Sequence, residues 1–362
     1  MPWLERVIPV GAVAVALAAG ACSESTSPGA ADPVAVASDV NGLSRAFTAG
    51  LGFQSLSALS PSFALSAPTA RLAPPAPSVN AWGFARGGVL ELMRQLGARA
   101  PAAPLALFPA NVLGKTFVWD TSSGGHYRMD STITGAPAAG VRFWLYYVAA
   151  GGSRPSLPLL PIGNVDLADQ STPQANAVGV KILYGDPRLS GGQTLANYAL
   201  KGVRTTGSFT LSASGYVVDT TGQQVTFSLS NALNTVDSTL RIYDTLSAAS
   251  GAQVWMQMVD SGSAHSHSLQ LNDHYQRGGQ TADVSGSATE AGADSTINVV
   301  FKFNGVTWAT VSGPESNPAF TDASGQTLTI AQEIATVEIL ADFLDIFTHA
   351  DVVFAPSALV FP

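Results

Sequence analysis

The sequence is poor in charged residues, and it contains a single cysteine. Only 12% of its 362 residues are charged, whereas a typical soluble domain carries about 25%. With 17 Lys and Arg against 25 Asp and Glu, the chain lacks the clustered positive charge that nucleic acid phosphates require, so we expect no nucleic acid partner. The lone cysteine, Cys22, excludes an intrachain disulfide and a cysteine-based zinc ribbon.

The sequence also lacks the short motifs that mark common catalytic and cofactor sites. It contains no G-x-S-x-G nucleophile elbow, no P-loop, no H-E-x-x-H metal motif, no EF-hand loop and no glycine-rich dinucleotide fingerprint. We therefore predict that the protein uses no cofactor and is not an enzyme.

The first 22 residues hold the most specific pattern in the chain. A continuous apolar run covers residues 7–21 and ends at Cys22. The run is shorter than the roughly 20 apolar residues of a transmembrane helix, and it suits the core of a signal peptide. We expect residues 1–21 to be a signal peptide that is removed on export.

The end of this segment, Ala19-Gly20-Ala21-Cys22, resembles the lipobox of bacterial lipoproteins, with Ala19 where that family usually has Leu. The resemblance implies that Cys22 is diacylated, becomes the mature N-terminus and anchors the protein in a membrane. Ser23 after the cysteine implies sorting to the outer membrane. Ala19 and Ala21 also suit ordinary signal peptidase, which would leave a secreted protein with an unlipidated Cys22. The resemblance covers only the signal segment and implies nothing about the rest of the chain.

The remaining chain divides into three stretches of different composition. Residues 22–38 are small, polar and interrupted by proline, which predicts a flexible tether. Residues 39–110 contain short amphipathic helical patterns between proline-rich linkers, and Asp39 has the character of a helix N-cap. Residues 111–362 form a β domain that ends in a helix at about 329–348.

From residue 111 onward the hydrophobic pattern has the period of a β-strand. Residues 224–229 and 297–303 alternate apolar and polar side chains, so each segment has one buried face. Gly278-Gly279 and Asn304-Gly305 are typical of tight hairpin turns. Because no helix of crossover length interrupts residues 111–315, we predict an antiparallel meander of up to about a dozen strands.

Two segments, 141–148 and 253–259, are apolar at most positions. We expect them to be strands that are buried on both faces at the centre of the sheet. Their aromatic side chains would either line a sugar or lipid site or, more commonly, fill the core. These aromatic residues are Trp144, Tyr146, Tyr147 and Trp255.

The C-terminal segment has the pattern of a helix covered on more than one side. Thr329 and Gln332 have the spacing of a capping box, and apolar residues, including both Phe343 and Leu344, then occupy about three quarters of the helical circumference. The predicted fold class is therefore α+β and mainly β. An antiparallel meander or curved sheet would pack against the N-terminal helices and this C-terminal helix.

Three histidines form the best candidate for a metal site. In a strand, His265 and His267 lie on one face about 7 Å apart, a spacing that suits two ligands of one ion, and Asp273 would add an oxygen. The same alternation places both histidines with apolar residues and puts His274 on the opposite face unless a turn redirects it. We therefore predict no metal site, with these three histidines as the candidates to test.

A second candidate surrounds a predicted hairpin tip. Asp120 and His126 flank the turn, and Ser122 or Ser123 would be the nucleophile of a catalytic triad. Serine and glycine at a hairpin tip commonly serve turn geometry instead, which is the interpretation we adopt.

These observations leave two main classes of function. The first is an exported cell-envelope lipoprotein, anchored in the outer membrane through Cys22, that acts as a non-catalytic structural or interaction module with another envelope protein. The alternative is a carrier or binder of an apolar ligand such as a lipid, enclosed between the sheet and the C-terminal helix, in an architecture similar to that of periplasmic half-barrel lipid carriers. A secreted hydrolase or a metal-binding protein is the second alternative.

Overall fold

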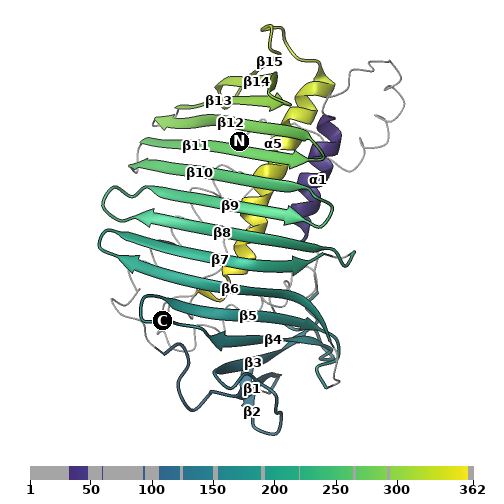
Figure 1. Ribbon diagram of the computed structural model, residues 1–362, viewed down its shortest axis with the longest axis vertical. Helices are drawn as coiled ribbons and strands as arrows, with labels where there is room; N and C mark the ends of the chain where they lie inside the picture. Colours follow the sequence, from purple (N-terminus) through teal and green to yellow (C-terminus); the bar gives the residue numbers. More distant parts are fainter. Residues whose placement is uncertain are drawn as a thin grey trace.

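The protein is mainly β in the computed structural model (Figure 1). The structure describes residues 32–47, 59, 93, 106–122, 125–149, 154–188, 192–219, 221–263, 266–291 and 294–357. Within these ranges the chain forms one open sheet of 15 strands and two long helices, α1 (Pro33–Arg45) and α5 (Ile330–Ala350), and a short 3-10 helix, η4 (Asp351–Phe354), follows α5. The predicted mainly β fold class is confirmed.

The strands follow the chain almost in order across the sheet. The first eight are β1 (Lys115–Asp120), β2 (His126–Asp130), β3 (Gly140–Tyr146), β4 (Pro161–Asp169), β5 (Asn176–Tyr184), β6 (Gln193–Thr205), β7 (Ser208–Val218) and β8 (Gln224–Asn234). The others are β9 (Leu240–Ala248), β10 (Gln253–Ser263), β11 (Ser266–Arg277), β12 (Gln280–Ala291), β13 (Asp294–Phe303), β14 (Val306–Pro314) and β15 (Ala319–Thr321).

The expected antiparallel meander is present from β3 to β15, where each strand pairs with the next along the chain. The sheet has more strands than the dozen expected. It also contains one parallel contact, because β1 lies between β2 and β3 and runs parallel to β3. The sequence pattern gave no sign of this arrangement, since alternation looks the same in a short parallel edge pair as in an antiparallel one.

The two hairpin turns that the sequence predicts are confirmed. Gly278 and Gly279 join β11 to β12 with φ of 56° and 84°, and Asn304 and Gly305 join β13 to β14 with φ of 49° and 78°. Two successive residues in the left-handed region form the turn whose twist matches that of the flanking strands. These turns fix the register of the strand pairs that they connect.

The expectation that 141–148 and 253–259 form doubly buried central strands is wrong in part. Strand β3 contains most of the first segment but lies third from one end of the sheet, next to β1. Strand β10 is an interior strand, yet Gln257 is exposed and Trp255 is only half-buried. Strand β3 is therefore largely buried on both faces but is not central, whereas β10 is interior but buried on one face only, with Trp255 on the other.

The first helix begins earlier than expected, inside the stretch predicted to be a tether. Asp32 is its N-cap, and Asp32 Oδ1 accepts a hydrogen bond of 3.0 Å from the Val34 backbone N–H. A proline follows the cap directly, where its missing N–H costs no hydrogen bond. Asp39, expected to be the cap, instead lies within the helix.

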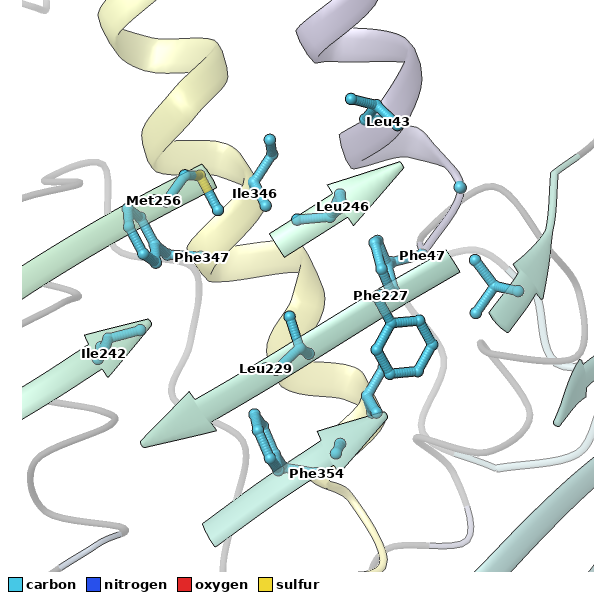
Figure 2. Close-up of a cluster of buried hydrophobic side chains, with 14 of the residues drawn as sticks. Leu43, Phe47, Phe227, Leu229, Ile242, Leu246, Met256, Ile346, Phe347 and Phe354 are labelled. Atoms are coloured by element: carbon cyan, nitrogen blue, oxygen red, sulfur yellow. The ribbon is translucent and has the colours of Figure 1, made fainter. Parts of the chain in front are cut away.

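The helices cover one face of the sheet, which we call the inner face. In Figure 1, α1 and α5 lie side by side and run across the strands. Figure 2 shows side chains from the helices and from the inner face in one buried cluster: Phe47 after α1 contacts Phe227 on β8 edge to face at 5.5 Å, and Phe347 of α5 and Met256 of β10 belong to the same cluster. The opposite side of the sheet is the outer face.

The C-terminal helix is only partly enclosed. Phe343 and Leu344 are both buried, with exposed fractions of 0% and 5%. The capping box is also confirmed, because the Thr329 N–H donates to Gln332 Oε1 at 3.0 Å and the Gln332 N–H donates to Thr329 Oγ1 at 3.4 Å. Helix α5 therefore contributes one broad face to the core, while Ile330, Glu338 and Ala341 of the same helix are exposed, so the helix is less completely enclosed than its apolar circumference predicts.

Candidate functional site

The structure separates the residues of the candidate metal site. His267 lies on β11, and the regular pairing of β11 with β10 and β12 continues to Arg277 without a turn at Asn272. By strand alternation, Asp273 therefore lies on the inner face, whereas His274 lies on the outer face. Cys22 and His265 lie outside the described residues. No group of three or more metal-ligating side chains occurs in the part of the chain that the structure describes.

Asp273, the proposed oxygen ligand, is buried on the inner face. Its carboxylate has an exposed fraction of 0% and no side-chain hydrogen-bond partner among the described residues. Asp273 on β11 and Asp244 on β9 both lie opposite Met256, one on each side of β10. Burial raises the pKa of Asp273 well above its usual range; a hydrogen bond from the Gln257 backbone opposes the rise, and the Asp244 carboxylate adds to it.

The second candidate, at the tip of the β1–β2 hairpin, has the geometry of a turn. Asp120 and His126 are cross-strand partners, but the Asp120 carboxylate accepts hydrogen bonds from the Ser122 N–H at 2.8 Å and the Ser122 hydroxyl at 2.6 Å. Arg128 Nε lies 3.1 Å from Asp120 Oδ2. These bonds lower the pKa of Asp120, with the Ser122 hydroxyl as the largest cause. Asp120 thus orders the turn, and Ser123 lies outside the described residues.

The predicted aromatic residues occupy three different settings. Tyr146 is buried and Trp144 packs against the core, whereas Tyr147 after β3 is 40% exposed. Trp255 lies on the outer face of β10, far along the sheet from the other three. The structure therefore does not gather the four into one site, and Trp255 is the member with polar, solvent-facing neighbours.

Trp255 lies in a patch on the outer face of β9, β10, β11 and β12, which we call the outer patch. Strand register aligns its twelve residues in three cross-strand rows. The rows are Ser247, Gln253, Gln276 and Thr281; Thr245, Trp255, His274 and Asp283; and Tyr243, Gln257, Asn272 and Ser285. Hydroxyl and amide side chains therefore surround two aromatic rings, and each residue is at least partly exposed.

The middle row is held together by side-chain contacts. The His274 and Trp255 rings lie 5.3 Å apart at an interplanar angle of 43°. On its other side, His274 Nδ1 lies 2.6 Å from Asp283 Oδ1, and both side chains are 37% exposed. The bond to Asp283 leaves Nε2 as the second hydrogen-bonding atom of the imidazole. The cross-strand neighbours of His274 are thus an indole and a carboxylate, which differs from the hydroxyl neighbour that a catalytic triad requires.

Sequence reasoning missed the pair of His274 and Asp283, although the signal was present. Gly278 and Gly279 form a two-residue turn, so residues at equal distance on either side must be cross-strand partners. Residue 274 and residue 283 meet that condition. Counting outward from the turn is enough to identify the pair of His274 and Asp283. Placing Trp255 next to His274 also requires the register of β10 and β11, which the turn does not give.

Comparison with known proteins adds no relative to this picture. No family model, no curated protein and no solved structure matches the chain. Among the described helices, none combines the length and the apolar character needed to cross a membrane.

Proposed function

We propose that this protein is a lipid-anchored protein of the cell envelope and a non-catalytic binding module, which presents the outer face of its sheet to a partner. The observation that carries the proposal is the outer patch, where Tyr243 is 51% exposed near Trp255 and most of the other side chains carry hydroxyl or amide groups. An exposed large aromatic side chain costs solvation free energy, and such residues commonly mark binding surfaces.

The anchor and the binding face occupy different parts of the chain. The lipobox-like segment that ends at Cys22 supports export and acylation, and Ser23 supports the outer membrane as the destination. The anchor precedes α1 in the sequence, and α1 packs on the inner face. This arrangement is consistent with an outer face that stays accessible while the protein is attached to the membrane.

The inner face favours a packed core over the alternative of an enclosed apolar ligand. The residues that would line such a cavity are in contact with one another in one buried cluster, which includes Phe343, Leu344, Phe347 and Met256. In Figure 2 the helix and strand side chains of this layer point toward one another. Close packing of this kind holds a core together, whereas a carrier needs a void of about 300 Å³ or more.

The proposal is tested by photo-crosslinking in intact cells. A benzophenone amino acid at Gln257 or Asn272, both exposed in the outer patch, is expected to give discrete adducts of higher mass. The matched control is the same amino acid at Ala341, which is exposed on α5 in the opposite layer. Adducts that are equally abundant at Ala341, or no adduct from either outer position, would contradict a binding role for the outer face.

A further inference from the structure

Going one step beyond the proposed function, and resting on it, we propose that the outer patch binds a neutral polysaccharide. Its three rows and four strands span about 14 Å in each direction, since paired rows lie two residues apart and strands about 4.8 Å apart. This area accommodates a short stretch of a sugar chain rather than a single small ligand.

The aromatic residues provide the contacts that a sugar ring needs on its less polar side. A pyranose ring carries C–H groups on its faces, and these pack against the electron-rich face of an aromatic ring. Tyr243 and Trp255 lie on adjacent strands, in adjacent rows of the same face. Two rings at this offset would contact two successive sugar units.

The groups around the rings match the hydroxyls of a sugar. Three glutamines and one asparagine offer both donors and acceptors, and four serine and threonine hydroxyls can act as either. These residues are Gln253, Gln257, Gln276, Asn272, Ser247, Thr245, Thr281 and Ser285. A sugar hydroxyl is also both donor and acceptor, so such a surface replaces the hydrogen bonds that the sugar makes with water.

The charge of the outer patch selects a neutral chain. Asp283 is its only carboxylate, and that group is already bonded to His274. The twelve residues of the patch include no lysine or arginine, but two exposed cations lie at its edges: Lys302 opposite Asp283 on β13, and Arg241 on β9 in the row next to Tyr243. Because these two cations lie on different edges, the patch offers no cluster of positive charge that would hold an acidic polysaccharide or a phosphate group. Protein interfaces, in contrast, are enriched in aromatic residues, methionine and arginine at their centre and depleted in serine. The composition therefore favours a sugar chain over a protein partner.

The contact between His274 and Asp283 also prepares the patch for binding. His274 is held by Asp283 on one side and packs against Trp255 on the other, which restricts the indole before a ligand arrives. Restricting an aromatic side chain in advance lowers the entropy lost on binding. His274 is thus a positioning residue for Trp255 in this proposal.

The test is affinity electrophoresis of the full-length protein, in detergent, through gels that contain a β-1,3-glucan, a β-1,4-glucan, a mannan or dextran. We expect at least one of these neutral polysaccharides to retard the wild type, and alginate, which is acidic, not to retard it. Trp255→Ala is expected to lower the apparent affinity for the polysaccharide, measured from the retardation, about tenfold, and Tyr243→Ala is expected to lower it about threefold or more. Tyr184→Ala is the matched control, because Tyr184 on β5 is also exposed, at 40%, but lies outside the patch.

A second variant keeps the test valid if Trp255→Ala unfolds the protein. Gln257→Lys adds a charge at an exposed position in the third row and is expected to reduce binding without lowering the melting temperature. Absence of retardation by all four neutral polysaccharides would overturn the proposal. So would retardation that survives both Tyr243→Ala and Gln257→Lys.

Failure of this inference is distinct from failure of the proposed function. One outcome is that Gln257 and Asn272 crosslink to a protein and that no neutral polysaccharide retards the wild type. This outcome would support the binding role of the outer face and would contradict a polysaccharide as its ligand. Absence of adducts at both positions would instead contradict the binding role itself.

Discussion

Asn41 of α1 donates a hydrogen bond from Nδ2 to Asp342 Oδ1 of α5, at 2.8 Å, and so joins two helices that are 301 residues apart in the sequence. The bond crosses the helix layer on the inner face, where α1 and α5 lie side by side (Figure 1). The pKa of Asp342 is raised to about 6, chiefly by burial; the nearby carboxylates of Asp345 and Glu338 contribute to the rise, while Asn41 and Arg45 oppose it. The helix layer therefore contains a titrating carboxyl group.

This carboxyl group predicts a pH dependence of stability. A pKa that is higher in the folded than in the unfolded state means that the contribution of Asp342 is complete below about pH 3.8 and is lost as the pH rises through about 6. We expect the wild type to lose about 1 kcal/mol of unfolding free energy over that range relative to Asp342→Asn, because part of the carboxyl group is in water. Urea unfolding at about pH 3.5 and about pH 7.5 measures the difference, and an equal change in unfolding free energy between these two pH values in both proteins would refute it.

Truncation of α5 tests whether the helix is enclosed. Phe343→Ala and Leu344→Ala each remove a buried side chain from the helix layer, and each is expected to lower the unfolding free energy by about 2–5 kcal/mol. Ile330→Ala is the control, since Ile330 is 76% exposed in the first turn of the same helix, and its truncation should cost no more than about 0.5 kcal/mol. The measurement is the urea midpoint of each of the three variants, compared with that of the wild type. A Phe343→Ala midpoint as high as that of Ile330→Ala would reject the enclosed helix.

Asp273 predicts a stabilising substitution. Its carboxyl group is fully buried and has no side-chain hydrogen-bond partner in the described parts of the chain, so Asp273→Val should raise the unfolding free energy by about 1–3 kcal/mol near neutral pH. Because the pKa of Asp273 is raised in the folded state, the wild type loses stability as the pH rises above about 3.8, and the advantage of the variant grows with pH. Asn272→Val, next in the strand but on the outer face, is the control. A melting temperature of Asp273→Val below that of the wild type would contradict this account.

The proposed membrane anchor depends on one residue. Cys22→Ser removes the only thiol in the chain, so we expect it to abolish incorporation of radiolabelled fatty acid and to release a soluble product. Cell fractionation of the wild type and the variant measures this. If the Cys22→Ser protein remains in the outer membrane fraction, the lipoprotein proposal is contradicted.

The sequence by itself determined which side chains face inward along most strands and where several hairpins turn. Two kinds of pattern are local, so they can be recognised without knowledge of the rest of the chain. They are the alternation of apolar and polar residues in 224–229 and 297–303, and the turn dipeptides at 278–279 and 304–305. The broad buried face of α5 was predictable for the same reason, because its apolar circumference can be counted along one helix. Even the pairing of His274 with Asp283 follows from the position of a turn.

Only the tertiary structure decided what covers each face and where each strand lies in the sheet. Alternation identifies a buried side but not the element that buries it, so the sequence could not show that Asp39 of α1 would receive hydrogen bonds from Tyr275 at 2.5 Å and Arg277 at 2.6 Å. The same limit explains the misplaced strand 141–148, whose apolar residues lie near one end of the sheet beside a parallel neighbour. Trp255 was likewise visible as an aromatic residue, but its partners come from three other strands, and contacts between strands depend on a register that no single segment contains.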